Sequence, residues 1–243
     1  MEQFHGMGKI SKIPQNNMKK ILVICSGGLD SIATAILALQ QPNVEVSLIS
    51  FDYGQKATRE LESARNLAAK YNLQHIIQDI SPLKFIFGKT QLTDEETKVE
   101  GEYRQSVVVP LRNAMFLQVA MIYAYAHDFD EVMLGSHLDD CQEVNGERLF
   151  PDCSPEFFSA YELAMRLGVF RKQKKVHIVT PSLLGMGKTD LIRAAHKLDP
   201  MSIYGSWSCY KNGAQQCGEC DSCKNRKKAF EAAGVWDGTG YEK

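Results

Sequence analysis

The chain has 243 residues, of which 44% are hydrophobic and 23% charged, and its formal net charge is −1. These values are typical of a globular protein with one large domain, or one domain and a small appendage. An almost neutral chain has no global electrostatic attraction for nucleic acid, so direct nucleic-acid binding is not expected. No apolar run approaches the roughly 20 residues that span a bilayer, so no membrane partner is expected either.

Residues 1–18 are polar and include Gly6, Gly8 and Pro14. They lack the apolar core of a signal peptide, so we expect a flexible lead-in, with Met18 as an alternative start, and a cytoplasmic location. In a reducing compartment the seven cysteines are expected to be thiols or metal ligands.

The first predicted strand is the apolar run Ile21–Cys25, which is short and rich in β-branched residues. The run Ile32–Leu39 follows with the apolar spacing of a helix. Between them, Ser26–Ser31 reads Ser-Gly-Gly-Leu-Asp-Ser. Glycines let backbone N–H groups approach a phosphate, and the start of a helix adds partial positive charge. The stretch is a candidate phosphate site, although an ordinary turn with a Ser/Asp cap has the same pattern.

This hexapeptide resembles the Ser-Gly-Gly-x-Asp-Ser signature of the PP-loop ATP pyrophosphatases and differs from the P-loop pattern. The resemblance implies that ATP is cleaved between its α and β phosphates, with the loop holding the pyrophosphate portion. A substrate oxygen would be adenylated, and a nucleophile would then displace AMP. Ser26 and Ser31 offer hydroxyl donors, whereas the Asp30 carboxylate would repel phosphates unless a Mg²⁺ ion lay between them.

Two further strands are predicted at Val44–Phe51 and Gln74–Ile80, with a helix over residues 56–71 between them. Strands that alternate with helices predict a doubly wound, parallel α/β sheet. Ligands of such sheets bind at the carboxyl ends of the strands, so Asp52–Gln55 should share an edge with Ser26–Ser31. The alternative is that Asp52–Gln55 is a plain turn.

Ser81–Ser106 breaks the alternation and is predicted as a solvated loop, or alternatively as a lid. Val107–Asn113 then enters a long helix. A cation such as Arg112 in the first turn opposes the helix dipole, and a bound anion would remove that cost. The alternative is that Arg112 points to water.

A fourth strand is predicted at Glu131–Gly135, and the polar stretch Ser136–Asp140 that follows is a candidate for Mg²⁺ or substrate contact. A polar turn would have the same sequence. Phe150–Phe158 leads into a helix that ends at Leu167, and Val176–Val179 is the fifth predicted strand.

Gly185–Asp190 has part of a P-loop pattern, but position 182 is serine where the first glycine belongs. The stretch also follows the last predicted strand. Lys188 and Thr189 open a helix, where a secondary phosphate contact and simple capping are equally good interpretations.

Four cysteines fall within fifteen residues near the end of the chain, at Cys209, Cys217, Cys220 and Cys223. Soft thiolates in a closed set of four favour a structural Zn²⁺ site, with an Fe–S cluster as the alternative. Cys25 and Cys153 are interpreted as small core residues, although Cys153 could instead face a substrate.

Together these motifs resemble the 7-cyano-7-deazaguanine synthase branch of the PP-loop family, from about Lys19 to Gly234. The stretches that carry the resemblance are Ser26–Ser31, Phe51–Gln55, Val109–Asn113, Pro151–Cys153 with Glu156 and Phe157, Gly187–Thr189, and Trp207–Cys223 with Arg226. The resemblance implies conversion of 7-carboxy-7-deazaguanine to a nitrile with ammonia and two ATP. It also implies a homodimer that contains Mg²⁺ and Zn²⁺.

The resemblance implies a role for each matching residue. The expected nucleotide contacts are Cys25, Ser26, Gly27, Gly28, Leu29, Asp30, Ser31, Phe51, Tyr53, Gly54, Gln55, Arg112 and Asn113. Asp30, Ser31 and Lys188 are the expected catalytic residues, and Asp139, Phe150 and Asp152 the expected acceptor contacts. The expected zinc ligands are Cys209, Cys217, Cys220 and Cys223.

The sequence departs from the family pattern in the stretch expected to form the acceptor pocket. Leu149–Phe150 stands where the family usually has a Gly-Tyr pair, and Cys141–Arg148 separates it from Asp139–Asp140. The acceptor therefore has alternatives: an amine other than ammonia, an amide as end product, or a tRNA-modifying reaction. A non-catalytic zinc-containing module is a further alternative. We divide the chain into a lead-in (1–18), an ATP-binding domain (19–200) and a zinc-binding subdomain (201–243).

Overall fold

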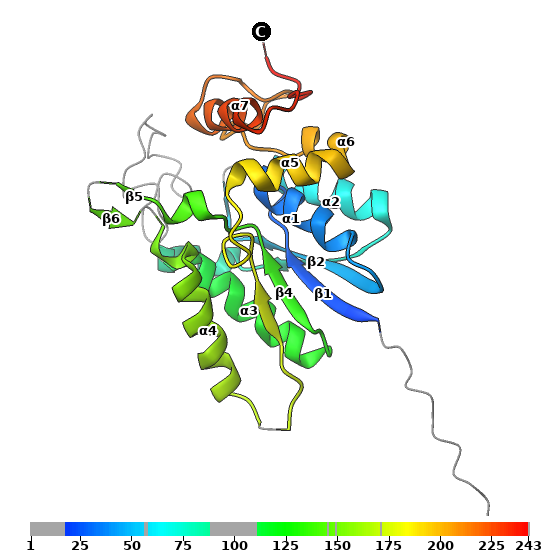
Figure 1. Cartoon of the computed structure of the whole chain (residues 1–243), viewed down its shortest axis with the longest axis vertical. Coiled ribbons are helices and arrows are strands. Elements are labelled where there is room, and N and C mark those ends of the chain that lie inside the picture. The colour runs from blue at the N-terminus through cyan, green and yellow to red at the C-terminus, as the bar shows by residue number, and fades with distance from the viewer. Residues whose placement is uncertain are drawn as a thin grey trace, which may run out of the picture.

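A parallel β-sheet forms the centre of the protein (Figure 1). The computed structural model describes residues 18–55, 58–87, 111–144, 146–148, 150–170 and 172–242. The strands are β1 (Lys19–Ile24), β2 (Val44–Asp52), β3 (Gln74–Asp79), β4 (Glu131–Leu134) and β7 (His177–Val179). Their order is β3-β2-β1-β4-β7, and every neighbouring pair is parallel. The predicted five-stranded, doubly wound sheet is confirmed.

The central strand β1 is buried on both faces, as its continuous apolar run predicts. Ile21 and Val23 pack into one core of the protein, while Leu22 and Ile24 pack into the other. The alternation follows from the strand itself, because successive side chains point to opposite faces.

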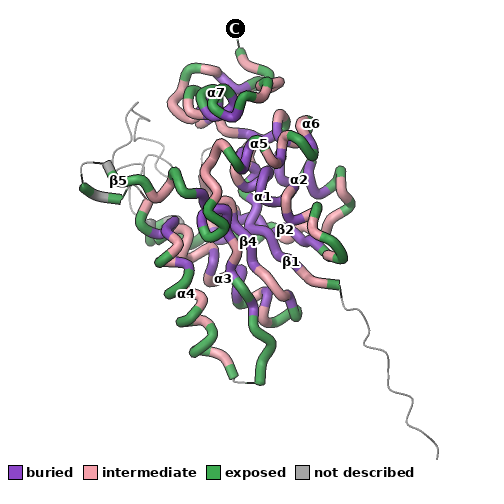
Figure 2. Tube along the Cα trace, viewed as in Figure 1, coloured by how far each residue is buried: buried purple, intermediate pink, exposed green. Residues whose placement is uncertain are grey.

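Helices cover both faces of the sheet. The core on one face includes residues of α1 (Leu29–Leu39), α2 (Arg59–Tyr71) and α5 (Lys188–Leu198). The core on the other includes residues of α3 (Arg112–Ala126) and α4 (Pro155–Leu167). Figure 2 shows that the buried residues are concentrated along the strands and α1. Within the described ranges, no helix is both long and apolar enough to cross a membrane.

Shorter elements surround this framework. They are α6 (Pro200–Tyr204), α7 (Asp221–Ala233), the hairpin of β5 (Glu143–Val144) and β6 (Glu147–Arg148), and 3-10 turns at Ser81–Phe87, Leu138–Cys141 and Pro151–Cys153. The helix α7 packs on α5 and adds Phe230 to the same core as α1.

Two elements of the structure differ in detail from those predicted from the sequence. Ser81–Phe87, expected to begin a solvated loop, forms a 3-10 helix instead. The remainder of that segment, with its lid alternative, lies outside the described residues. The first helix begins at Leu29 rather than Ile32, because Gly28 adopts the extended N-cap conformation and Leu29 is already buried. Asp30 and Ser31 therefore lie in the first turn of α1.

Candidate active site

The Ser-Gly-Gly turn leaves the carboxyl end of β1 and enters α1. Gly27 has a φ of +94°, a conformation that side chains disfavour. A Cβ atom there would lie 1.8 Å from the backbone oxygen of Glu60, at the start of α2. Gly28 is the N-cap of α1. Only glycine fits position 27, and the turn is held against α2.

The two serines of the turn have different surroundings. The buried Ser31 hydroxyl accepts a hydrogen bond from the Gly27 N–H (3.0 Å) and donates one to the Gly28 carbonyl (3.0 Å). Ser26 is exposed, with its hydroxyl 3.2 Å from that of Ser31. Ser31 therefore fixes the shape of the turn, and Ser26 is the serine accessible to a ligand.

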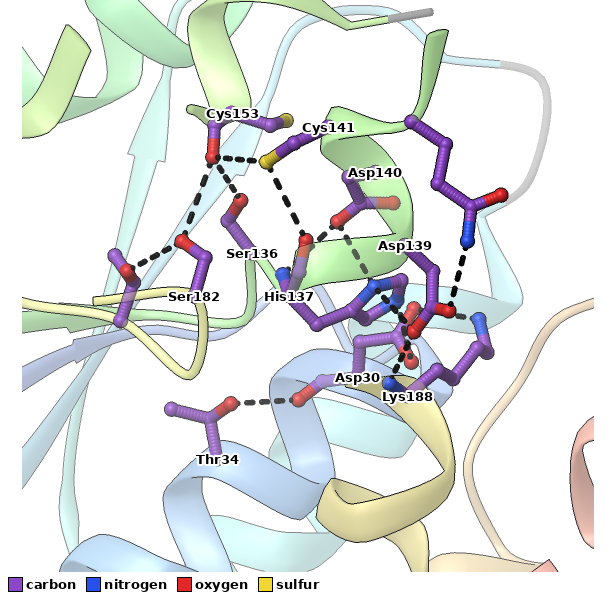
Figure 3. Close-up of polar contacts among 12 residues, drawn as sticks. Asp30, Thr34, Ser136, His137, Asp139, Asp140, Cys141, Cys153, Ser182 and Lys188 are labelled. Atoms are coloured by element: carbon purple, nitrogen blue, oxygen red, sulfur yellow. Dashed lines mark hydrogen bonds and ion pairs between the residues drawn. The ribbon is translucent and has the colours of Figure 1, made fainter. Parts of the chain in front are cut away.

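A cluster of charged side chains lies beside this turn (Figure 3). The Asp30 carboxylate is 3.0 Å from Lys188 Nζ and 3.6 Å from His137 Nε2. The other ring nitrogen of His137 lies 3.5 Å from Asp140 and 3.7 Å from Asp139. Asp30 and Lys188, which the sequence assigned to catalysis, are thus brought together from positions 158 residues apart.

The charges in this cluster alter one another's ionisation. Burial opposes the ionisation of Asp30, but Lys188 and His137 hold the pKa of its carboxyl well below the usual range. Burial likewise opposes protonation of His137, yet Asp30 and Asp140 raise the pKa of the imidazole. The cluster therefore favours an anionic Asp30 beside a cationic His137.

Several polar atoms in this cluster are incompletely satisfied. Within the described residues, Asp30 Oδ1 and both ring nitrogens of His137 are buried and make no hydrogen bond. Buried polar atoms that have ion-pair neighbours but no hydrogen bond are incompletely stabilised, and a bound ligand or ion commonly provides the missing contacts. This feature marks the cluster as a candidate binding site for an anion or a metal-bound anion.

Close backbone packing brings the cluster together. A Cβ atom on Gly135, just after β4, would lie 2.7 Å from the backbone carbon of Asp30, so only glycine allows this approach. The Asp139 carboxylate accepts a hydrogen bond from the Lys188 backbone N–H, which ties the segment after β4 to the start of α5.

A second group of polar residues consists of Arg112, Tyr53 and Glu60. Arg112, the first residue of α3, donates a hydrogen bond to the Tyr53 hydroxyl (3.4 Å) and does not simply point to water. The carboxylate of Glu60 approaches within 4.0 Å of the position that a Cβ on Gly28 would occupy. Glu60 was not among the sequence-predicted site residues. An acidic residue in the first turn of a helix is common because it interacts favourably with the helix dipole. The position of Glu60 in the sequence therefore gave no sign of a functional role.

The predicted nucleotide residue Asn113 contacts the predicted acceptor residue Asp152. The Asn113 backbone N–H donates to the Asp152 carboxylate (3.2 Å), and its side chain donates to Cys153 Sγ (3.2 Å). Burial raises the pKa of Asp152. Cys153 is buried in the core, whereas Phe150 is only partly buried. Ser154 is the N-cap of α4, and its hydroxyl accepts a hydrogen bond from the Phe157 N–H (3.2 Å).

The other residues predicted to contact the nucleotide are buried or hydrogen-bonded within the protein. Phe51 is buried and stacks on Phe116 with ring centroids 4.5 Å apart. The Gln55 side chain accepts from the Tyr53 N–H (3.0 Å) and donates to the Phe51 carbonyl (3.3 Å), so it closes the turn at Gly54 (φ +75°). The side chains of Cys25 and Leu29 are likewise buried in the core.

The four clustered cysteines converge on one point. Their sulfur atoms all lie within 4.8 Å of one another, so Cys209, Cys217, Cys220 and Cys223 can hold a metal ion. Backbone N–H groups also point at sulfur: those of Lys211 and Cys217 lie 3.4 Å from Cys209 Sγ. Such donors favour the thiolate form that a metal requires. The donor set fits a closed structural site.

Trp207 connects this cysteine cluster to the Ser-Gly-Gly turn. Its backbone N–H donates to the Gly27 carbonyl (3.0 Å), and its indole N–H donates to the Cys209 carbonyl (2.9 Å). The segment that carries the cysteine cluster therefore supports the turn through Trp207.

A parallel sheet with a Ser-Gly-Gly-x-Asp-Ser turn at its carboxyl edge, flanked by Lys188 and His137, defines a nucleotide-binding α/β protein of the PP-loop type. The chain belongs to the family described as queuosine biosynthesis protein QueC, whose family model matches residues 20–234. It is therefore an enzyme of an ATP-using family.

Relatives match nearly the whole chain. A protein of Thermoplasma acidophilum is 39% identical over 233 residues, covering 93% of each chain. One from Allorhizobium ampelinum is 35% identical over 232 residues and covers 92% of each. Both are named 7-cyano-7-deazaguanine synthase. The solved structure of NMN synthetase from Francisella tularensis is similar at 14% identity, with a TM-score of 0.44, and covers 93% of this chain and 80% of that one. That similarity is too distant to bear on function.

Proposed function

We propose that the protein converts 7-carboxy-7-deazaguanine to 7-cyano-7-deazaguanine, with ammonia as the nitrogen source and two ATP per product. The observation that carries this proposal is its match to the named synthases over more than nine tenths of the chain. The charged cluster beside the Ser-Gly-Gly turn supports it, because that cluster suits an anionic polyphosphate.

The chemistry accounts for the need for ATP. A carboxylate is a poor electrophile because its leaving group would be oxide. Attack of the carboxylate oxygen on the α-phosphorus forms the acyl adenylate and releases pyrophosphate. Ammonia then adds to the acyl carbon, and AMP leaves with the electrons of the C–O bond, which gives the amide. A second ATP adenylates the amide oxygen, and loss of that oxygen as AMP, with two protons from nitrogen, leaves the nitrile.

The residues around the turn would supply the charge stabilisation that this adenylation needs. The backbone N–H groups at the start of α1 and the Ser26 hydroxyl bind the departing pyrophosphate. Lys188 and His137 place positive charge beside it, and Arg112 does so from the opposite side. Asp30 and Asp139 would hold Mg²⁺, which neutralises polyphosphate charge when it is bound.

The acceptor would bind beyond Arg112. The Asp152 carboxylate suits the N–H edge of a deazaguanine, because a carboxylate accepts from paired N–H donors. Phe150 would stack on the ring. The four cysteines would hold Zn²⁺ in a structural role. We further infer that the protein is a cytoplasmic homodimer and that the chain divides at residues 18 and 200. Light scattering tests the homodimer, and limited proteolysis tests the division.

A direct assay tests the proposed function. The purified protein is incubated with 7-carboxy-7-deazaguanine, Mg-ATP and ammonium, and the products are identified by mass spectrometry while pyrophosphate is measured. The expected result is the nitrile with two pyrophosphates per product. An amide as the final product would assign the protein to amide formation, and a complete absence of pyrophosphate would support a binding module instead.

A further inference from the structure

Glu60 is an acidic residue that lies beside the Ser-Gly-Gly turn. It is the second residue of α2, and the backbone of that helix start touches Gly27. Its carboxylate extends toward Gly28, the N-cap of α1, to within 4.0 Å of a Cβ position there. The carboxylate therefore lies beside the turn to which the proposed function assigns the departing pyrophosphate.

The charges around Glu60 come from three elements. Arg112 on α3 is its cationic neighbour, the Tyr53 hydroxyl follows β2, and the Cys25 thiol ends β1. The hydrogen bond that Arg112 makes here goes to Tyr53 and not to Glu60. No group among the described residues donates a hydrogen bond to the carboxylate of Glu60, a partly buried residue. Burial raises its pKa to about 7, with Arg112 opposing the shift.

This carboxylate differs from the other acidic groups near the turn. Asp30 already has Lys188 and His137 beside it. Glu62, two residues along α2, is exposed and pairs with Arg59 at 3.0 Å. Of these three, Glu60 is the one that faces the turn with no hydrogen-bond donor among the described residues. A single carboxylate is a poor Mg²⁺ site, because Mg²⁺ needs six oxygen ligands in octahedral geometry. A small cation that carries its own N–H donors suits it better.

We propose that Glu60 binds the ammonium ion and removes its proton beside the adenylated carbon. The inference rests on the proposed function. An N–H bond of ammonium breaks and an O–H bond forms on the Glu60 carboxyl. The nitrogen lone pair then forms the C–N bond, AMP departs with the C–O electrons, and the remaining excess proton passes from nitrogen to water. Ammonium is the main form of ammonia at neutral pH and is not a nucleophile, so a base at this position accounts for its use.

The test is Glu60→Gln, which keeps the shape and removes the negative charge, with Glu62→Gln as the matched control on the same helix. Two steps are measured: the pyrophosphate released in a single turnover without ammonium, and the amide formed with ammonium at pH 7. In Glu60→Gln we expect kcat/KM for ammonium to fall about 100-fold or more, while the single-turnover pyrophosphate burst persists. Glu62→Gln should match the unaltered protein in both kcat/KM for ammonium and the pyrophosphate burst.

A second nucleophile separates proton removal from structural effects. Hydroxylamine is uncharged at neutral pH, so its use needs no base of this kind. Glu60→Gln should form hydroxamate at nearly the normal rate, and its deficit with ammonium should shrink as the pH is raised and free ammonia accumulates. Glu60→Asp retains the carboxylate and should therefore recover part of the activity with ammonium. This variant keeps the proposal testable if Glu60→Gln does not fold.

Two results would overturn the proposal. One is an unchanged kcat/KM for ammonium in Glu60→Gln. The other is an equal loss of pyrophosphate release, amide and hydroxamate, which would assign Glu60 to the nucleotide or to the turn itself. If the unaltered protein releases no pyrophosphate at all, the proposed function fails first, and the role of Glu60 fails with it.

Discussion

Asp30 occupies the most charged position of the site. Its carboxylate lies between Lys188 and His137, and one of its oxygens is buried without a hydrogen bond among the described residues. These neighbours keep Asp30 ionised despite its burial. Under the proposed function, an anion beside the Ser-Gly-Gly turn is compatible with ATP only when cations surround it, so the charge of Asp30 is expected to matter for chemistry more than for folding.

Replacing Asp30 by Asn tests this role. The substitution keeps the shape of the side chain, so the thermal unfolding midpoint should change little, while pyrophosphate release should fall by about 100-fold or more. Asp128→Asn, at a position away from the site with φ of +59° that Asn tolerates, serves as the control. Undiminished pyrophosphate release in Asp30→Asn would remove Asp30 from the mechanism.

The pH dependence of ATP binding should depend on His137. Asp30 and Asp140 raise the pKa of the imidazole against the effect of its burial, so its positive charge persists above the ordinary value of about 6.5. A group with a raised pKa contributes below that pKa and is lost as the pH rises through it. The KM for ATP should therefore increase on the alkaline side of neutrality, and the increase should disappear in His137→Gln. A pH-independent KM in the unaltered protein would contradict this assignment.

At the scale of elements, the site is formed by helix starts and strand ends that touch through their backbones. The turn after β1 lies against the first residues of α2, and Gly135 after β4 lies against the first turn of α1. These contacts bring Asp30, His137 and Lys188 together, and they leave no room for a side chain at the two glycines.

Gly27→Ala should therefore damage both stability and ATP binding. Its new Cβ would lie 1.8 Å from a backbone oxygen and would also require an unfavourable φ. We expect the free energy of unfolding to fall by roughly 3 kcal/mol, with loss of measurable ATP binding. Gly185→Ala is the matched control, because Gly185 has a similar φ of +73° and nothing within 4 Å of the added atom. That variant should lose only about 1 kcal/mol and bind ATP normally. Equal losses in the two variants would show that contact with α2 is unimportant.

The elements differ in how well the sequence predicts them. The strands β1, β2 and β4 are predictable because their apolar runs are buried, and the turn after β1 is predictable from its glycines. The hairpin of β5 and β6 is not, because two-residue strands leave no periodic pattern. The sequence also places Ser31 among the phosphate donors, although its hydroxyl is engaged within the turn, a detail that only the folded geometry reveals.

At the scale of the molecule, the carboxyl-terminal segment supports the centre of the fold. Arg226 on α7 is buried and donates hydrogen bonds to the Ser206 and Ile203 carbonyls, which fixes the chain next to Trp207. Trp207 in turn joins the cysteine cluster to Gly27. The cysteine cluster and the Ser-Gly-Gly turn are therefore joined through Trp207.

Cys220→Ala should reveal this link. Three remaining thiolates cannot close a four-sulfur site, so bound zinc should be lost and the free energy of unfolding should fall by roughly 4 kcal/mol. ATP affinity should fall as well, because Trp207 would no longer be held. Metal content, thermal unfolding and ATP binding are measured in parallel with Cys141→Ala, which lies outside the cluster and should retain its metal. A stable Cys220→Ala protein with one full equivalent of zinc would contradict the assignment.

The hydrogen bond from Trp207 to Gly27 has a consequence for biosynthesis. The ribosome makes the turn after β1 long before it makes Trp207, whose backbone N–H donates to that turn. A nascent chain that does not yet include Trp207 should therefore lack this hydrogen bond. We expect the turn to reach its final order only after Trp207 has been synthesised and has folded back onto Gly27.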